Sequence, residues 1–256
     1  MIESAQNKII KELKLLSEKK HRDRLNLFIA DGLRFVSEIP DDMKVEKMIF
    51  SSSFVLKNDI SAFKKRTKCY EVSDRLFREI SETENPQGIM AVCEKMDFDT
   101  EKIIRKDGFY IIAEELNDPG NLGTIIRTAY AAGVDGVILS KGSVDLYNPK
   151  VLRSTMGAIF KIPIIQNADI EYIISVMKNK KINIYAAHLK GKTYHYNLDL
   201  RHGCAFMLGN EARGLSDKSA AMCDQLVKIP MPGGAESLNA SVAAAVLIYE
   251  AVRQRY

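Results

Sequence analysis

The apolar positions in the first part of the chain follow the period of a helix in some stretches and form short runs in others. Residues 1–20 place isoleucines and leucines three or four positions apart with lysines between them, which predicts an amphipathic helix. Further along, we predict strands at 25–30, 45–50, 69–72 and 88–94, and helices at 32–37, 54–66 and 74–80. This alternation is typical of a small α/β sandwich.

The remainder of the chain alternates in the same way, but with longer helices. We predict strands at 109–116, 137–139, 162–165, 182–188, 204–209 and 226–229, and helices at 122–132, 149–160, 170–179 and 237–253. Strands that alternate with helices indicate a mostly parallel sheet covered on both faces. The run 98–108 is rich in Lys, Asp and Glu. We therefore predict one domain at 1–97, a linker at 98–108 and a second domain at 109–256.

Composition adds little to this picture. A length of 256 residues suits two domains, and 46% apolar residues suffice for a sizeable core. The net charge of +4 permits contact with a polyanion without requiring it. Residues 1–24 are more telling, because they hold seven basic residues against four acidic ones.

Several classes of protein are disfavoured by what the sequence lacks. The four cysteines are far apart and form no CxxC pair, so we expect neither a metal site nor a disulfide framework. Met1–Lys20 is charged and amphipathic, and no apolar run approaches the roughly 20 residues that span a bilayer. We therefore expect a cytoplasmic protein with no signal peptide and no membrane partner.

Three glycine-containing loops follow predicted strands of the second domain, at 117–124, 209–216 and 230–239. Ligands bind at the carboxyl ends of the strands in parallel α/β sheets, so these loops are where a site is expected. Turn chemistry explains much of them: Gly120 suits a positive φ, and Asn121 and Ser237 suit helix N-caps. Polar side chains remain unexplained at Arg127, Glu211 and Asn239.

None of the loops has a phosphate-binding pattern. The chain lacks both GxxxxGK[ST] and GxGxxG after the first strand of this domain, which makes a nucleotide-dependent oxidoreductase a remote alternative. The loops instead offer bare peptide groups beside Leu208, Ile229, Met231 and Leu238, which looks buried. A pocket of this kind suits a ligand with an adenine ring and few charges.

The segments NDPGNLGTIIRTA, MLGNEARGLS and IPMPGGAESLNASVAAAVLIYE resemble, in order and spacing, the three motifs of the SpoU/TrmH family of RNA 2′-O-ribose methyltransferases. This resemblance covers about residues 109–256. The stretches HRDRLNLFIADGLRFV and SETENPQGIMAV resemble the ribosomal-protein-like substrate-binding domain of the same family. The resemblance therefore extends over nearly the whole chain.

The resemblance implies a fold and a cofactor. It implies a trefoil-knotted α/β domain, threaded between about residues 182 and 229, and a homodimer whose active site lies near the subunit interface. The implied cofactor is S-adenosylmethionine, bound in the knot. Matching positions place it against Leu208, Gly209, Ile229, Met231 and Leu238, with Ala187 near the adenine.

The resemblance also gives Arg127 the central catalytic role. The family's assignment favours a deprotonated arginine that acts as the base, although a free arginine has a pKa above 12. The other reading keeps Arg127 cationic, so that it clamps an RNA phosphate and stabilises the developing alkoxide, and we favour it on physical grounds. Asn121 would orient the arginine or the ribose, and Glu211 would hold Arg127 or the partner loop. Ser237 and Asn239 would complete the polar shell.

The basic start of the chain suggests RNA capture by the first domain. The residues expected to contact RNA are Lys19, Lys20, His21, Arg22 and Arg24. The implied target is ribosomal RNA of the large subunit, with no role for DNA. A tRNA 2′-O-methyltransferase and a non-catalytic RNA-binding factor for ribosome assembly stay open as alternatives.

Overall fold

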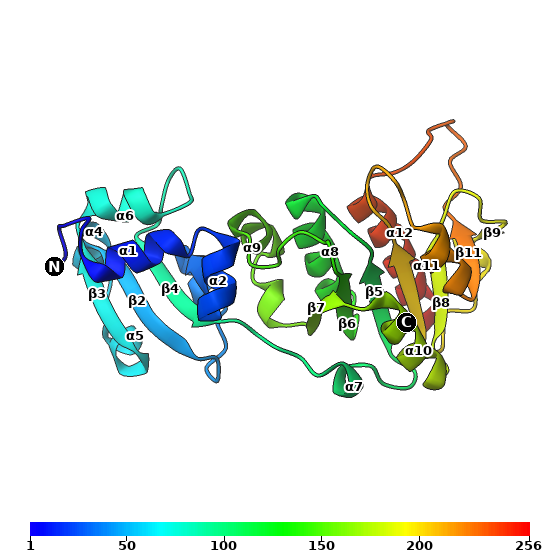
Figure 1. Cartoon of the computed structure of the whole chain (residues 1–256), viewed down its shortest axis with the longest axis horizontal. Coiled ribbons are helices and arrows are strands. Elements are labelled where there is room, and N and C mark those ends of the chain that lie inside the picture. The colour runs from blue at the N-terminus through cyan, green and yellow to red at the C-terminus, as the bar shows by residue number, and fades with distance from the viewer. The chain divides into compact units, whose positions relative to one another are not determined.

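The protein, described over all 256 residues by a computed structural model, divides into two compact units (Figure 1). The first unit comprises residues 1–96 together with 147–153, and the second comprises 97–146 and 154–256. The range 98–108, expected as a linker, lies in the second unit and includes α7 (Thr100–Ile103). Ile104 is fully buried in the core of that unit, so this charged stretch is anchored by an apolar side chain.

The first unit is built on a four-stranded sheet in the order β1-β4-β2-β3. The β4 strand pairs antiparallel with β1 and β2, whereas β2 and β3 are parallel. The apolar stripe of α1 packs with α6 against this sheet, through buried side chains such as Leu13, Leu76 and Met90. The strands are β1 (Leu27–Asp31), β2 (Val45–Ser51), β3 (Lys68–Val72) and β4 (Ile89–Glu94). The helices are α1 (Lys8–Leu15), α2 (Lys19–Leu25), α3 (Leu33–Ser37), α4 (Ser52–Lys57), α5 (Ser61–Arg66) and α6 (Asp74–Ile80).

Two helices predicted in this unit are each divided. The single helix expected over 1–20 is wrong, because α1 ends at Leu15 and α2 begins at Lys19. The helix expected over 54–66 is also two helices, α4 and α5. Asn58 is extended, and its side chain donates to the carbonyl of Phe54 at 2.9 Å, which satisfies an acceptor at the end of α4. A periodic apolar pattern does not reveal such interruptions.

The second unit contains a seven-stranded sheet in the order β7-β6-β5-β10-β8-β11-β9, in which every pair is parallel. The predicted parallel α/β sheet is thus confirmed. Because the strands are parallel, their carboxyl ends meet at one edge, where the loops described below gather. The strands are β5 (Phe109–Ala113), β6 (Gly136–Ser140), β7 (Ile164–Ala168), β8 (Asn183–Ala187), β9 (Thr193–Tyr194), β10 (Cys204–Leu208) and β11 (Gln225–Lys228).

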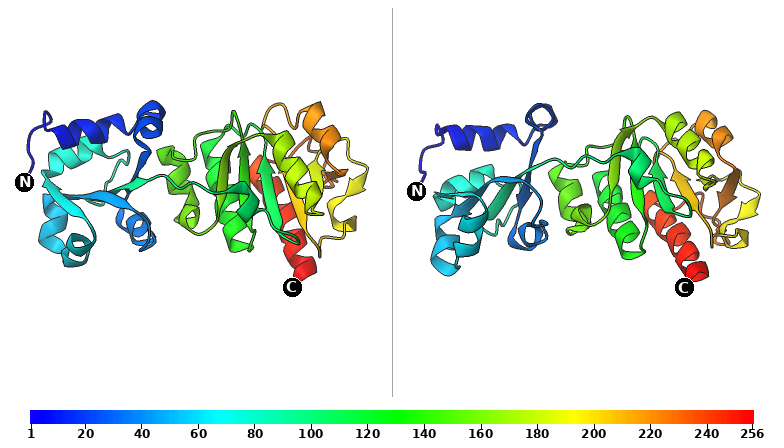
Figure 2. Two further views of the ribbon diagram at one scale, coloured as in Figure 1. Left: turned by 60° about the horizontal axis from the view of Figure 1, so that its bottom comes forward. Right: turned by 90° about the horizontal axis from the view of Figure 1, so that it is seen from below.

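Helices cover both faces of this sheet (Figure 2). On one face α8 packs against α12, and α12 contacts β10. On the other face α10 contributes Ile173 and Met177 to a core shared with Ile112 and Met207 of the strands. The helices of this unit are α8 (Pro119–Ala131), α10 (Ile170–Asn179), α11 (Asp217–Met222) and α12 (Ala240–Arg255), with short 3-10 turns η1 (Ala158–Phe160) and η2 (His195–Asn197). Most of α9 (Pro149–Thr155) falls within residues 147–153, which belong to the first unit.

The pattern of the second unit missed its shortest elements. Neither β9 nor α11 was predicted, since two to six residues are too few to display a period. The helix expected over 149–160 is interrupted, because the backbone takes left-handed φ values at Met156 and Gly157. No helix in the chain is both long enough and apolar enough to cross a membrane.

Candidate active site

A cavity of about 1130 Å³ opens at the carboxyl ends of β8, β10 and β11. All six residues expected to bind the cofactor line it, namely Ala187, Leu208, Gly209, Ile229, Met231 and Leu238. Three of the residues expected to be catalytic, Glu211, Ser237 and Asn239, also line it. The tertiary structure thus brings loops that are far apart in the sequence to one hollow.

The walls of the cavity are largely apolar, with a few peptide groups that are free to bind a ligand. Leu208 at the end of β10 and Leu247 of α12 are buried beneath it. Leu238 is 36% exposed, so the expectation that it is buried is wrong; its side chain faces the open cavity. The peptide groups of Gly209 and Ile229 make no hydrogen bond within the chain. Such walls accept a flat apolar ring and hydrogen-bond its polar edge.

The loop after β10 has a shape that only glycine permits at its first position. Asn210 and Gly214 exchange two backbone hydrogen bonds, so the loop folds back on itself. A Cβ atom on Gly209 would lie 2.1 Å from the carbonyl carbon of Gly214 and from the nitrogen of Leu215. Glycine at position 209 therefore lets two backbone segments touch and leaves its own peptide group facing the cavity.

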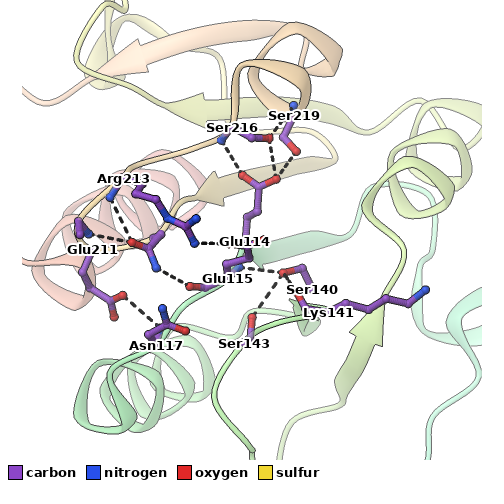
Figure 3. A network of polar contacts seen from close by, with 12 residues as sticks. Glu114, Glu115, Asn117, Ser140, Lys141, Ser143, Glu211, Arg213, Ser216 and Ser219 are labelled. Atoms are coloured by element: carbon purple, nitrogen blue, oxygen red, sulfur yellow. Dashed lines mark hydrogen bonds and ion pairs between the residues drawn. The ribbon is translucent and has the colours of Figure 1, made fainter.

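Two glutamates at the end of β5 hold this loop in place (Figure 3). Glu114 accepts hydrogen bonds from the amide and hydroxyl of Ser216. Glu115 pairs with Arg213 at 2.5 Å, and its carbonyl accepts from the side chain of Asn210 at 2.8 Å. Sequence reasoning missed these anchors. Their only signal was a pair of acidic residues directly after a fully buried strand.

A chain of hydrogen bonds connects the three loops. One carboxylate oxygen of Glu211 accepts from the Asp118 amide at 3.0 Å and from the Asn121 side chain at 3.1 Å. The other carboxylate oxygen accepts from the Asn117 amide at 3.1 Å. The side-chain oxygen of Asn121 then accepts from the side-chain nitrogen of Asn239 at 2.8 Å. We call Glu211, Asn121 and Asn239 the amide relay.

The protonation of Glu211 follows from these contacts. Burial alone would raise its pKa, but the hydrogen bonds from Asn121, Asp118 and Asn117 outweigh that effect and lower the pKa below the usual 4.5. The carboxylate also sits at the N-terminus of α8, where the helix dipole favours a negative charge. Glu211 is therefore a fixed anion that holds the first turn of α8.

Two predicted helix caps are wrong, and the correction explains the relay. Asp118 caps α8, because its carboxylate accepts from the Asn121 amide at 2.8 Å and Pro119 occupies the first turn. Gly120 lies within that helix and has no positive φ. The N-cap of α12 is Asn239 instead of Ser237. The Asn121 side chain is thereby released from capping and reaches the other two loops.

Within one chain, Arg127 makes no contact with the amide relay. Its side chain is exposed on α8, does not line the cavity, and makes no hydrogen bond or ion pair. Within one chain, Glu211 binds the start of α8 and makes no contact with Arg127. Ser237 lines the cavity, exposed and without a hydrogen bond. The guanidinium of Arg127 is thus available to a molecule that binds next to α8.

The residues expected to contact RNA in the first unit have different surroundings. Lys19, Lys20 and Arg24 are exposed on α2, and His21 is half-buried. Arg22 is only 4% exposed, and its guanidinium donates to the carbonyls of Leu16 and Ser17. Arg22 therefore satisfies carbonyls beyond the end of α1, and its assignment to RNA contact is corrected.

The fold and the cavity define the class of this protein, which is a parallel α/β protein with a small-molecule site at the carboxyl ends of its strands. Residues 108–249 match the profile of the SpoU rRNA Methylase family, and residues 7–91 match that of the MRM3-like substrate binding domain. The chain therefore belongs to the SpoU rRNA methylase family, and the membership expected from its three motifs is confirmed.

Proteins of similar sequence and structure cover almost the full chain. The 23S rRNA (guanosine(2553)-2′-O)-methyltransferase RlmP of Bacillus subtilis is 34% identical over 97% of both chains. The 23S rRNA (uridine(2479)-2′-O)-methyltransferase of Streptomyces viridochromogenes is 30% identical over 94% of this chain and 88% of its own. An rRNA methyltransferase from Sinorhizobium meliloti, solved with S-adenosylmethionine bound, superposes with a TM-score of 0.90 at 31% identity and covers 100% and 98% of the two chains. The expected class of enzyme and its cofactor are confirmed by these relatives.

Proposed function

We propose that this protein transfers the methyl group of S-adenosylmethionine to a ribose 2′-hydroxyl of large-subunit ribosomal RNA. The observation that carries the proposal is the amide relay, which joins all three family motifs at the rim of one cavity. Two relatives that cover the chain end to end are named for ribose methylation of 23S rRNA.

The cavity suits the cofactor. Its volume of about 1130 Å³ exceeds the usual 300–1,000 Å³ of a small-molecule site, which leaves room for the target ribose beside the cofactor. Leu208, Ile229 and Leu238 supply apolar surface for adenine, and the Gly209 peptide group supplies hydrogen bonds. When bound, the cofactor supplies a methyl group on a positively charged sulfur, which needs alignment more than activation.

In this proposal the residues of the chain align the reactants and stabilise the negative charge that develops on the ribose oxygen. The amide relay fixes the first turn of α8 and the N-terminus of α12 against each other, so that the cavity keeps its shape. Arg127 binds an RNA phosphate and stabilises the alkoxide that forms as the 2′-hydroxyl loses its proton. The Arg127 guanidinium is exposed and makes no hydrogen bond within the chain, and a guanidinium binds phosphate in a bidentate manner, which favours the clamp over the base.

We further propose a homodimer that completes the site. Val242 and Tyr249 are exposed about two turns apart on α12, with the half-buried Val246 between them. Tyr130 is exposed on α8, the helix that packs beside α12. An apolar strip of this kind is typical of an interface. Because Arg127 lies one turn from Tyr130, dimerisation would bring this free cation beside the partner's cavity.

The trefoil knot is also a proposal, supported by the order of the strands. β10 lies between β5 and β8, and β11 lies between β8 and β9, so later strands are inserted between earlier ones. The connection from β8 to β9 crosses closely over β11: a Cβ atom on Gly191 would lie 2.8 Å from the carbonyl carbon of Val227. A close crossing of this kind supports a chain that is threaded through its own loop.

The first unit is proposed to capture the RNA through α2. Lys19, Lys20 and Arg24 are exposed, and Asp23 is neutralised by an ion pair with Lys95. The hydrogen bond from Lys95 lowers the pKa of Asp23, which favours the ionised carboxylate. We also propose a cytoplasmic location, in keeping with a ribosomal RNA substrate.

Ribose-methylation maps of ribosomal and transfer RNA, from cells with and without the gene, test the proposal. We expect one 2′-O-methyl site in large-subunit RNA to disappear. A site lost from tRNA would establish the first alternative. If no site changes and calorimetry detects no S-adenosylmethionine binding, the proposed activity is refuted in favour of a non-catalytic RNA-binding factor for ribosome assembly.

A further inference from the structure

An aromatic pair extends from the cavity to the surface at the edge of the large sheet. Tyr194 belongs to β9, the outermost strand (Figure 1), and lines the cavity. Its ring stacks on that of Tyr196, with centroids 5.3 Å apart and an angle of 22° between the planes. Tyr196 is 47% exposed. The stack therefore begins beside the cavity and ends at solvent.

One lysine contacts this stack, and two more lie close to it in the sequence. The ammonium nitrogen of Lys228 lies 5.1 Å from the centre of the Tyr194 ring. Lys190 lines the same cavity, and Lys192 is exposed next to β9. None of the three lysines forms an ion pair, and residues 188–197 include no Asp or Glu. The positive charge of this edge is thus available to an anionic partner.

Packing alone does not account for the arrangement. His195, between the two tyrosines, is buried and anchors the segment in the protein. Tyr196 contributes an edge contact to the His195 ring at 5.2 Å but leaves nearly half of its own surface in water. Aromatic rings stabilise a contact through the large apolar surface that they bury in it. The exposed part of Tyr196 is therefore surface that remains for a ligand.

We propose that Tyr194 and Tyr196 form a stacking platform for an unpaired RNA base next to the methylated nucleotide. Lys190, Lys192 and Lys228 bind the phosphates on either side. Single-stranded RNA is recognised by bases stacked on aromatic side chains and by cations along its backbone, and both features occur here at the rim of the cavity. The inference rests on the proposed function and identifies the part of the chain that selects a single-stranded target.

The test measures RNA and cofactor binding separately for Tyr196→Ala and Tyr196→Phe. The probes are an unmodified 23S rRNA transcript and S-adenosylmethionine. We expect Tyr196→Ala to weaken RNA binding, and to raise the KM for RNA, by roughly ten-fold. Tyr196→Phe keeps the ring and should retain wild-type binding, and neither variant should change cofactor affinity by more than about two-fold. Tyr256→Ala, at a tyrosine that is 98% exposed and far along the chain, is the matched control.

Lys228→Gln supplies an independent measure. Loss of one phosphate contact should reduce the slope of log affinity against log salt by about one. Unchanged RNA binding by Tyr196→Ala would overturn the inference, and weaker cofactor binding with normal RNA binding would make the platform part of the cofactor pocket. Methylation by the wild-type protein in the same assay reports on the proposed function. A wild type that binds cofactor but modifies no RNA would refute that function, whatever the variants do.

Discussion

The side-chain nitrogen of Asn239 donates a hydrogen bond to the side-chain oxygen of Asn121 at 2.8 Å, across 118 positions of sequence. The orientation of both amides is determined, because the nitrogen of Asn121 faces the carboxylate of Glu211 and the oxygen of Asn239 caps α12. One anion therefore sets the direction of two amides and fixes two helix N-termini relative to each other.

The first prediction concerns this contact. Asn121→Ala and Asn239→Ala should each lower kcat by about ten-fold or more, since loss of the contact releases the start of α8 relative to α12. In a double-mutant cycle the two effects should be coupled by about 0.5–3 kcal/mol. Asn179→Ala, at an exposed asparagine on α10, should leave kcat unchanged. Strict additivity of the two losses would show that the amides act independently.

The second prediction concerns the charge of Glu211. Its pKa is lowered in the folded state, so its contribution to stability is present above the ordinary value of 4.5 and is lost as the pH falls through the lowered value. Glu211→Gln should therefore be less stable than the wild type at pH 7, and the difference should shrink below about pH 4.5. Chemical denaturation of the two proteins at pH 7 and at pH 3 measures this difference in stability. Glu236→Gln, at an exposed residue on the same cavity, is the control; a constant difference between pH 7 and pH 3 would contradict the assignment.

The third prediction concerns Arg127. Arg127→Ala should reduce methyl transfer by about a hundred-fold or more, while cofactor affinity stays within a few-fold because the residue does not line the cavity. Arg127→Lys retains a charge and should recover part of the activity if the residue is a clamp. Single-turnover rates and calorimetry distinguish the two effects. A large loss of cofactor binding in Arg127→Ala would show that Arg127 contacts the cofactor, contrary to the role proposed for it.

The fourth prediction separates stability from RNA binding in the first unit. Arg22→Ala should lower the free energy of unfolding by about 1–3 kcal/mol, because it leaves two carbonyls without their donor. Lys19→Gln, Lys20→Gln and Arg24→Gln should leave stability within about 0.5 kcal/mol. Each should reduce the salt dependence of RNA binding by about one phosphate contact. Equal salt slopes for these variants and the wild type would remove α2 from the RNA-binding surface.

The fifth prediction concerns the loop after β10. Gly209→Ala should abolish most cofactor binding, because the added Cβ atom would push the loop away from Gly214 and Leu215. Gly233→Ala provides a matched control, since a Cβ atom there meets nothing within 4 Å. Isothermal calorimetry compares the two. Normal cofactor affinity in Gly209→Ala would mean that the loop can shift without closing the cavity.

Prediction from sequence succeeded where a feature is local or repeated. The central strands β5, β6 and β10 are fully buried runs, and α10 begins and ends where its apolar period predicts. It failed at interruptions such as the break between α4 and α5, because an apolar period does not show where a helix stops and starts again. It also failed at the caps of α8 and α12, because several nearby polar residues can occupy the N-cap.

The sequence by itself determined the alternation of strands and helices and the three motifs, and the family resemblance of those motifs indicated six of the residues that line the cavity. It did so because burial periodicity and motif spacing are properties of neighbouring residues. Only the tertiary structure decided that Asn121 pairs with Asn239 and Glu211, that Arg22 is buried, and that Arg127 is free. These outcomes depend on which segments the strand order brings together, and a polar side chain acquires its role from partners that are distant in sequence.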